Sequence, residues 1–158
     1  MQTITPCLWF DTQAEEAADF YVSVFPNSEV LAVSRYAEGG PMPAGTALTV
    51  EFTLNGIAYR ALNGGPGHPF TDAISLSVNA PIQPEIDRLW DLLTSDGGAP
   101  GPCGWLTDRF GLSWQVVPPR LSELMSDPDP AVATRVMQAM MAMGKLEIAE
   151  LEAAAKAG

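Results

Sequence analysis

The 158-residue sequence predicts an α+β fold made of two tandem βαβββ modules followed by C-terminal helices. Three observations support this prediction. A strand, a helix and further strands recur after an offset of about 68 residues, which indicates an internal repeat. Asn55-Gly56, the strongest short signal for a β-hairpin, joins two strand-like runs. Beyond Pro118-Pro119 only helical periodicity remains.

The first module begins with a strand in ITPCLWF, which follows Thr5-Pro6, and continues with a helix. Thr12 and Glu15 have the spacing of a capping box, in which each side chain accepts a backbone N–H near the helix start. The apolar face expected for this helix has three- and four-residue spacing and consists of Ala14, Ala17, Ala18, Tyr21, Val24 and Phe25. Three strands are expected next, starting at Glu29, Thr46 and Ile57.

The second module follows the Gly- and Pro-rich break NGGPGHPF, residues 63–70. A strand is expected from Ala73, then a helix over PIQPEIDRLWDLL with Pro84 early. The buried face expected for that helix is Ile86, Leu89, Trp90 and Leu93. Two strands, one ending near Leu106 and one in LSWQVV, are joined by the turn-forming run Asp108–Gly111. The second module is therefore expected to be about one strand shorter than the first.

Two helices are recognisable in the C-terminal part. One begins at Asp129-Pro130, a good N-cap and N1 pair, and a second begins at Lys145. Their apolar stripes are Val132, Val136, Met140 and Met143, and Ile148, Leu151 and Ala155. The Met-rich stripe of Met137, Met140, Met141 and Met143 either packs in the core or against a second subunit, or it forms an adaptable binding surface. We expect one domain over residues 1–120, in two units of about 1–66 and 67–120, and a helical extension over 121–158.

Composition excludes several function classes. The net charge of −11, from 8 basic and 19 acidic residues, opposes binding to nucleic acid. No apolar run approaches the roughly 18 residues of a membrane span, and the N-terminus lacks the pattern of a secretory leader. Cys7 and Cys103 are too few for a disulfide framework and lack C-x-x-C spacing. We expect a soluble, cytoplasmic protein without nucleic-acid or membrane partners.

Several sequence blocks together resemble a known family. They are LWFD with AEEAADFYVSVF, ALNGGP, FTDAISLSV, CGWLTDRFGLSWQVVP and the tail RVMQAMMAM. The sequence resembles the PhnB-like family, often labelled 3-demethylubiquinone-9 3-methyltransferase-like. This family is part of the vicinal oxygen chelate superfamily of glyoxalase I, extradiol dioxygenases and bleomycin-resistance proteins. The resemblance implies paired βαβββ modules around a concave pocket, and a homodimer.

The methyltransferase label can be weighed against the sequence. A methyl donor such as S-adenosylmethionine is usually held by a glycine-rich turn between a strand and a helix. The Gly-rich stretch NGGPGHP leads toward another strand and contains two prolines. The sequence therefore does not favour methyl transfer.

The resemblance also implies four positions at which metal-dependent superfamily members place His or Glu ligands. By residue-wise matching these positions hold Thr5 or Pro6, Arg60, Ala73 and Gln115. None of these is a good ligand for a first-row divalent ion, and an Arg brings a positive charge. We expect no metal, no other cofactor and none of the usual glyoxalase or dioxygenase chemistry.

Seven residues are candidates for a pocket: Cys7, Trp9, Arg60, Asn63, His68, Asp72 and Gln115. His68 is either an acid/base oriented by Asp72 or a surface loop residue. Cys7 is either a nucleophile or a small buried apolar residue. The tryptophans Trp9, Trp105 and Trp114 either line a pocket or belong to the core. Strand alternation places Trp114 and Gln115 on opposite faces, so the two cannot line one pocket wall.

Three classes of function remain open at this point. The first is a metal-independent small-molecule binding protein in which Arg60 and Gln115 contact anionic or carbonyl oxygens. The second is an enzyme, either a metal-free isomerase or lyase in which Arg60 stabilises an oxyanion and His68 or a water moves the proton, or the methyltransferase of the family label. The third is a structural dimer with a vestigial pocket. We expect the first.

Overall fold

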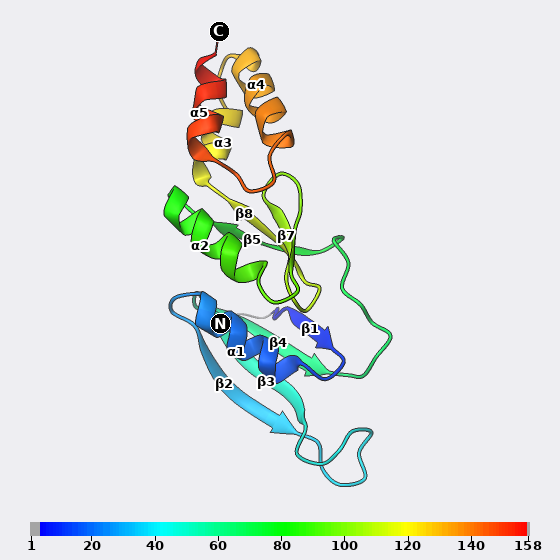
Figure 1. The fold of residues 1–158 in the computed structure, drawn as a ribbon. Helices are drawn as coiled ribbons and strands as arrows, with labels where there is room; N and C mark the ends of the chain where they lie inside the picture. Colours follow the sequence, from blue (N-terminus) through cyan, green and yellow to red (C-terminus); the bar gives the residue numbers. More distant parts are fainter. Residues whose placement is uncertain (1–3, 158) are drawn as a thin grey trace. The chain divides into compact units, whose positions relative to one another are not determined.

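The computed structural model describes residues 4–157 and confirms the α+β fold. The chain divides into two compact units between Pro69 and Phe70, and each unit holds one four-stranded mixed sheet (Figure 1). No helix within the described part of the chain is both long and apolar enough to cross a membrane.

The first unit has the predicted βαβββ order. Its elements are β1 (Cys7–Phe10), α1 (Ala14–Val24), β2 (Glu29–Arg35), β3 (Ala47–Leu54) and β4 (Ile57–Asn63). The sheet order is β1-β4-β3-β2, with β1 parallel to β4 and the other pairs antiparallel. Helix α1 contacts β3 and β4, and it buries five residues of the predicted apolar face, namely Ala14, Ala17, Ala18, Tyr21 and Val24.

The hairpin between β3 and β4 forms at the predicted place. Leu54 pairs with Ile57, so only Asn55 and Gly56 lie in the turn. Their φ angles are 49° and 79°, and two consecutive positive φ angles characterise the type I′ turn that matches the twist of a β-hairpin.

The predicted capping box at the start of α1 is wrong. The residue before the helix is Gln13, and no side chain from this local segment caps the first turn. Instead the side chain of Asn63 accepts a hydrogen bond from the Ala14 backbone N–H at 2.8 Å. The parallel pairing of β1 and β4 places Asn63 opposite Phe10, just before the helix, whereas Glu15 forms an ion pair with Arg35.

The second unit repeats the pattern with shorter strands. Its first elements are β5 (Ser75–Asn79), α2 (Gln83–Leu93), β6 (Ala99–Pro100), β7 (Trp105–Thr107) and β8 (Ser113–Val117). The order is β5-β8-β7-β6, with β5 parallel to β8. The expectation of one strand fewer is wrong, because the two-residue β6 completes the sheet; a strand this short has no alternation to detect in the sequence. Helix α2 buries the predicted face, Ile86, Leu89, Trp90 and Leu93.

Three helices follow β8: α3 (Pro119–Met125), α4 (Pro130–Met141) and α5 (Ile148–Lys156). Asp129 caps α4 as predicted, with its Oδ1 accepting from the Ala131 N–H at 2.9 Å. Helix α5 begins at Ile148 instead of Lys145, because Glu147 has an extended backbone and Lys145 and Leu146 are held by contacts with α2.

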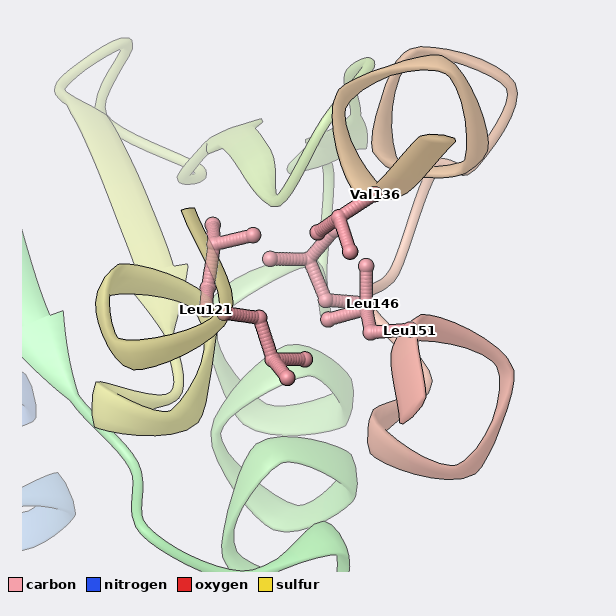
Figure 2. Packing of buried hydrophobic residues seen from close by; sticks show 5 residues of the cluster. Leu121, Val136, Leu146 and Leu151 are labelled. Carbon is pink, nitrogen blue, oxygen red and sulfur yellow. The ribbon is translucent and has the colours of Figure 1, made fainter. Parts of the chain in front are cut away.

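The helices enclose a small apolar core of their own. It consists of Leu121, Leu124, Val136, Leu146 and Leu151 (Figure 2). Met140 and Met143 from the predicted stripe pack against this core. Met137 and Met141, on another side of α4, are exposed.

Candidate ligand-binding site

One face of the second-unit sheet carries polar side chains. Trp105 pairs with Gln115, and Thr107 pairs with Ser113, so these four side chains share a face of β7 and β8. Ser75 and Ser77 of β5 pair with Ser113 and Gln115 and extend the polar face to the sheet edge. The alternate residues Leu106, Trp114 and Val116 are buried on the opposite face.

Gln115 is half-buried on this polar face and has a defined partner. Its Nε2 donates to Ser75 Oγ at 2.9 Å. Trp114 points the other way, and its Nε1 donates to Asp108 Oδ2 at 2.8 Å. The predicted separation of Trp114 and Gln115 onto opposite faces is confirmed.

A hollow with a cavity volume of about 300 Å³ opens beside this face, entirely within the second unit. We call it the second-unit hollow. It is lined by Asp72, Gly101, Pro102, Trp105, Leu106, Thr107 and Ser113. Of the predicted pocket residues, Asp72 lines the hollow. Gln115 does not line it but is the register partner of Trp105, which does.

The lining combines two kinds of contact. Trp105 and Pro102 supply apolar surface, and Thr107 and Ser113 supply hydroxyl groups that can donate or accept hydrogen bonds. The one ionisable side chain in the lining is the carboxylate of Asp72. The arrangement suits a compact ring that stacks on an indole and carries a few polar substituents.

Sequence reasoning missed Thr107 and Ser113. The signal was present in LSWQVV, because Ser113 and Gln115 are two residues apart and polar while their neighbours are apolar. That alternation predicts one polar face on an otherwise buried strand.

A buried carboxylate holds the turn between β7 and β8. Asp108 is 2% exposed, and its Oδ1 accepts from the Phe110 and Leu112 N–H groups at 2.9 and 3.0 Å. Its Oδ2 accepts from Trp114 Nε1. The sequence identified the turn that starts at Asp108, but not that this carboxylate fixes the strand carrying Gln115.

Three other predicted pocket residues, Trp9, Asn63 and His68, lie in the first unit. The rings of Trp9 and His68 lie with centroids 4.5 Å apart and planes tilted by 53°. Trp9 Nε1 donates to the Gly65 carbonyl at 2.9 Å, and a Cβ on Gly64 would come within 2.2 Å of the Trp9 ring. Asn63 caps α1, and its carbonyl accepts from the Tyr36 hydroxyl. These contacts fix the loop after β4.

Cys7 and Arg60 lie side by side on the open face of the first sheet. They are register partners, and Arg60 in turn pairs with Glu51 on β3. Arg60 Nε donates to Glu51 Oε1 at 2.5 Å, so a carboxylate already compensates the guanidinium charge. Cys7 is exposed as a residue, which contradicts its interpretation as a small buried apolar side chain.

The environment of Cys7 does not activate the thiol. Partial burial raises the pKa of Cys7 above its usual value, although Arg60 opposes this effect. A raised pKa reduces the thiolate fraction, and the thiolate is the nucleophile. We expect Cys7 to react with iodoacetamide several-fold more slowly than free cysteine at neutral pH, measured by mass spectrometry of the labelled peptide. Labelling of Cys7 faster than free cysteine would contradict this assignment.

The implied metal-ligand positions do not form a metal site. Arg60 and Gln115 lie on β4 and β8, the last strand of each module, and each is engaged by a neighbouring side chain, Glu51 or Ser75. Ala73 precedes β5, and Gln115 instead pairs in register with Ser77 and donates a hydrogen bond to Ser75. Within residues 4–157 there is no group of three or more His, Cys, Asp or Glu side chains that could hold an ion. These residues do not fit a divalent cation.

Comparison with known proteins places the chain in a family. Residues 2–117 match the family model described as 3-demethylubiquinone-9 3-methyltransferase. A PhnB protein from Bacillus cereus, provisionally described by the same activity, is 38% identical, with 73% of this chain and 98% of that chain covered and a TM-score of 0.66. A Pseudomonas aeruginosa protein has the same fold at 23% identity, with 73% and 96% coverage and a TM-score of 0.59. No curated protein matches the chain.

The matched region ends at Val117, the last residue of β8. It therefore covers both sheets and the second-unit hollow, while α3, α4 and α5 lie beyond it. Because the match spans well over half of the sequence, the chain belongs to the PhnB-like family, whose model is described as 3-demethylubiquinone-9 3-methyltransferase.

Proposed function

We propose that the protein binds a small organic molecule in the second-unit hollow without the help of a metal ion. The observation that carries this proposal is the hollow itself, with Trp105 beside the hydroxyl groups of Thr107 and Ser113. A volume of about 300 Å³ lies at the lower end of the range for ligand pockets, so the ligand is compact. Because Asp72 is the one ionisable lining residue, a neutral or cationic ligand is favoured over an anion.

Binding is favoured over the two enzymatic alternatives. A metal-free isomerase or lyase was expected to use Arg60 and His68, but Arg60 pairs with Glu51 and His68 packs on Trp9. For methyl transfer, the Gly-rich segment after β4 would have to open a helix, whereas it leads to strand β5. The polar face and hollow of the second unit remain the best-supported site.

The test is a screen of compact aromatic amines and aromatic alcohols by two-dimensional NMR. A ligand of the second-unit hollow should shift the signals of Thr107, Ser113 and the Trp105 indole. We expect Trp105→Ala to weaken binding roughly tenfold or more, because it removes the largest apolar surface of the lining. Retained affinity in Trp105→Ala would contradict the site assignment.

A matched tryptophan substitution serves as the control. Trp9→Phe changes an aromatic residue of the first unit and should leave the affinity unchanged within about twofold, because Trp9 is not part of the hollow. Loss of binding in Trp9→Phe together with normal binding in Trp105→Ala would move the site to the first unit.

A further inference from the structure

The segment between α4 and α5 lies against a loop that forms part of the second-unit hollow. We call residues 143–148 the docking segment and residues 101–104 the wall loop. The wall loop contributes Gly101 and Pro102 to the lining of the hollow. Cys103 N donates to the Met143 carbonyl at 2.8 Å, and Gly104 N donates to the Gly144 carbonyl at 2.7 Å. Two successive amides of the wall loop are thus bound by the docking segment.

The wall loop has a backbone conformation that needs support. Cys103 has a φ of 56°, in the left-handed region that side chains other than glycine adopt at a cost, and Gly104 has a φ of 84°. A Cβ on Gly104 would come 2.9 Å from the Val116 carbonyl and 3.0 Å from Leu146 Cδ1. The loop therefore packs closely between β8 and the docking segment, and we infer that its left-handed backbone conformation depends on both.

The docking segment is itself anchored in two places. Leu146 is fully buried in the apolar core of the C-terminal helices (Figure 2). Gln83 at the start of α2 donates from Nε2 to the Leu146 carbonyl at 3.0 Å and accepts from the Ile148 N–H at 2.9 Å. Lys145 Nζ lies 2.5 Å from Asp87 Oδ1, also on α2. The helices, α2 and the wall loop therefore form one connected support.

Within this support, the C-terminal helices and the docking segment lie beyond the part of the chain that the family model covers. The family model ends at Val117, and 73% of this chain already covers 98% of the Bacillus cereus protein. We propose that the C-terminal helices are a positioning element for ligand binding, which hold the left-handed wall loop and thereby shape one side of the second-unit hollow. The predicted effect on ligand affinity rests on the proposed function. The predicted support of the wall loop by the docking segment does not.

The test compares amide hydrogen exchange at Cys103 and Gly104 in full-length, ligand-free protein. The double variant Gln83→Ala/Lys145→Met removes both anchors of the docking segment on α2 and leaves the lining of the hollow unchanged. We expect exchange at these two amides to accelerate roughly tenfold or more, because local opening of the loop becomes easier. If the double variant does not unfold cooperatively, Gln83→Ala alone provides the same readout.

The matched control is Arg135→Met. Arg135 donates to the Ala154 and Ala155 carbonyls at 3.0 and 2.9 Å, so it joins α4 to the end of α5 without contacting the docking segment. This variant should leave exchange at Cys103 and Gly104 unchanged. Unchanged exchange in the anchor variants, or equal acceleration in Arg135→Met, would overturn the proposal.

Ligand binding is measured separately with a compound that the NMR screen identifies. Weaker binding by the double variant and normal binding by Arg135→Met supports the positioning role. Faster exchange with unchanged affinity overturns that role. If no compound binds the wild-type protein while exchange accelerates as expected, the proposed function fails and the bracing of the wall loop stands.

Discussion

Replacing Asp108 with alanine is expected to lower the free energy of unfolding by about 3–5 kcal/mol. The carboxylate is buried and accepts three hydrogen bonds, from the Phe110 and Leu112 N–H groups and from Trp114 Nε1. Alanine would leave these donors without their acceptor, and an unsatisfied buried donor costs about 1–3 kcal/mol. Urea denaturation followed by tryptophan fluorescence measures the loss.

Asp108→Asn separates the roles of the two carboxylate oxygens. The amide oxygen can still accept from the Phe110 and Leu112 N–H groups, but the amide nitrogen would then face the Trp114 N–H, donor against donor. We expect an intermediate loss of about 1–3 kcal/mol. The exposed Asp72→Ala is the control and should change stability by less than about 0.5 kcal/mol. Equal stabilities of Asp108→Ala and Asp72→Ala would show that this hydrogen-bond network contributes little.

The parts of the fold that the sequence predicts are those encoded by local repetition. Three- and four-residue spacing located α1 and α2 and their buried faces, and Asn55-Gly56 located the hairpin. These signals depend on residues a few positions apart, so a single sequence contains all of their information. Strand β6 has only two residues and is defined by its partner β7, so it has no local signal.

The candidate site could be predicted only in part, for the same reason. Alternation along β8 predicts that Gln115 and Trp114 face opposite ways, but the partner of Gln115 is Ser75, 40 residues earlier. The resemblance draws attention to Arg60, yet its pairing with Glu51 follows from the register of β3 and β4. The second-unit hollow depends on the wall loop, whose support comes from Met143 and Gly144 far along the chain.

Asn63 shows how a residue selected for a pocket can have a structural role. It is 1% exposed, and both ends of its side-chain amide are used: Oδ1 accepts from the Ala14 N–H at 2.8 Å, and Nδ2 donates to the Ala47 carbonyl at 2.9 Å. It therefore caps α1 and joins the helix to β3 from its own position at the end of β4. Only an amide of this length can donate and accept at once in these two directions.

Asn63→Ala is accordingly expected to lower the free energy of unfolding by about 2–4 kcal/mol, through the lost helix cap and the unpaired Ala47 carbonyl. Asn63→Asp keeps an acceptor for the Ala14 N–H but places a carboxylate oxygen against that carbonyl, so it should also destabilise the first unit. Asn79→Ala, at the exposed end of β5, is the matched control and should have little effect. Denaturant unfolding monitored by circular dichroism distinguishes the three variants. A loss for Asn63→Ala no greater than that for Asn79→Ala would mean that water replaces the Asn63 amide at both backbone groups, and that the start of α1 is less enclosed than its contacts indicate.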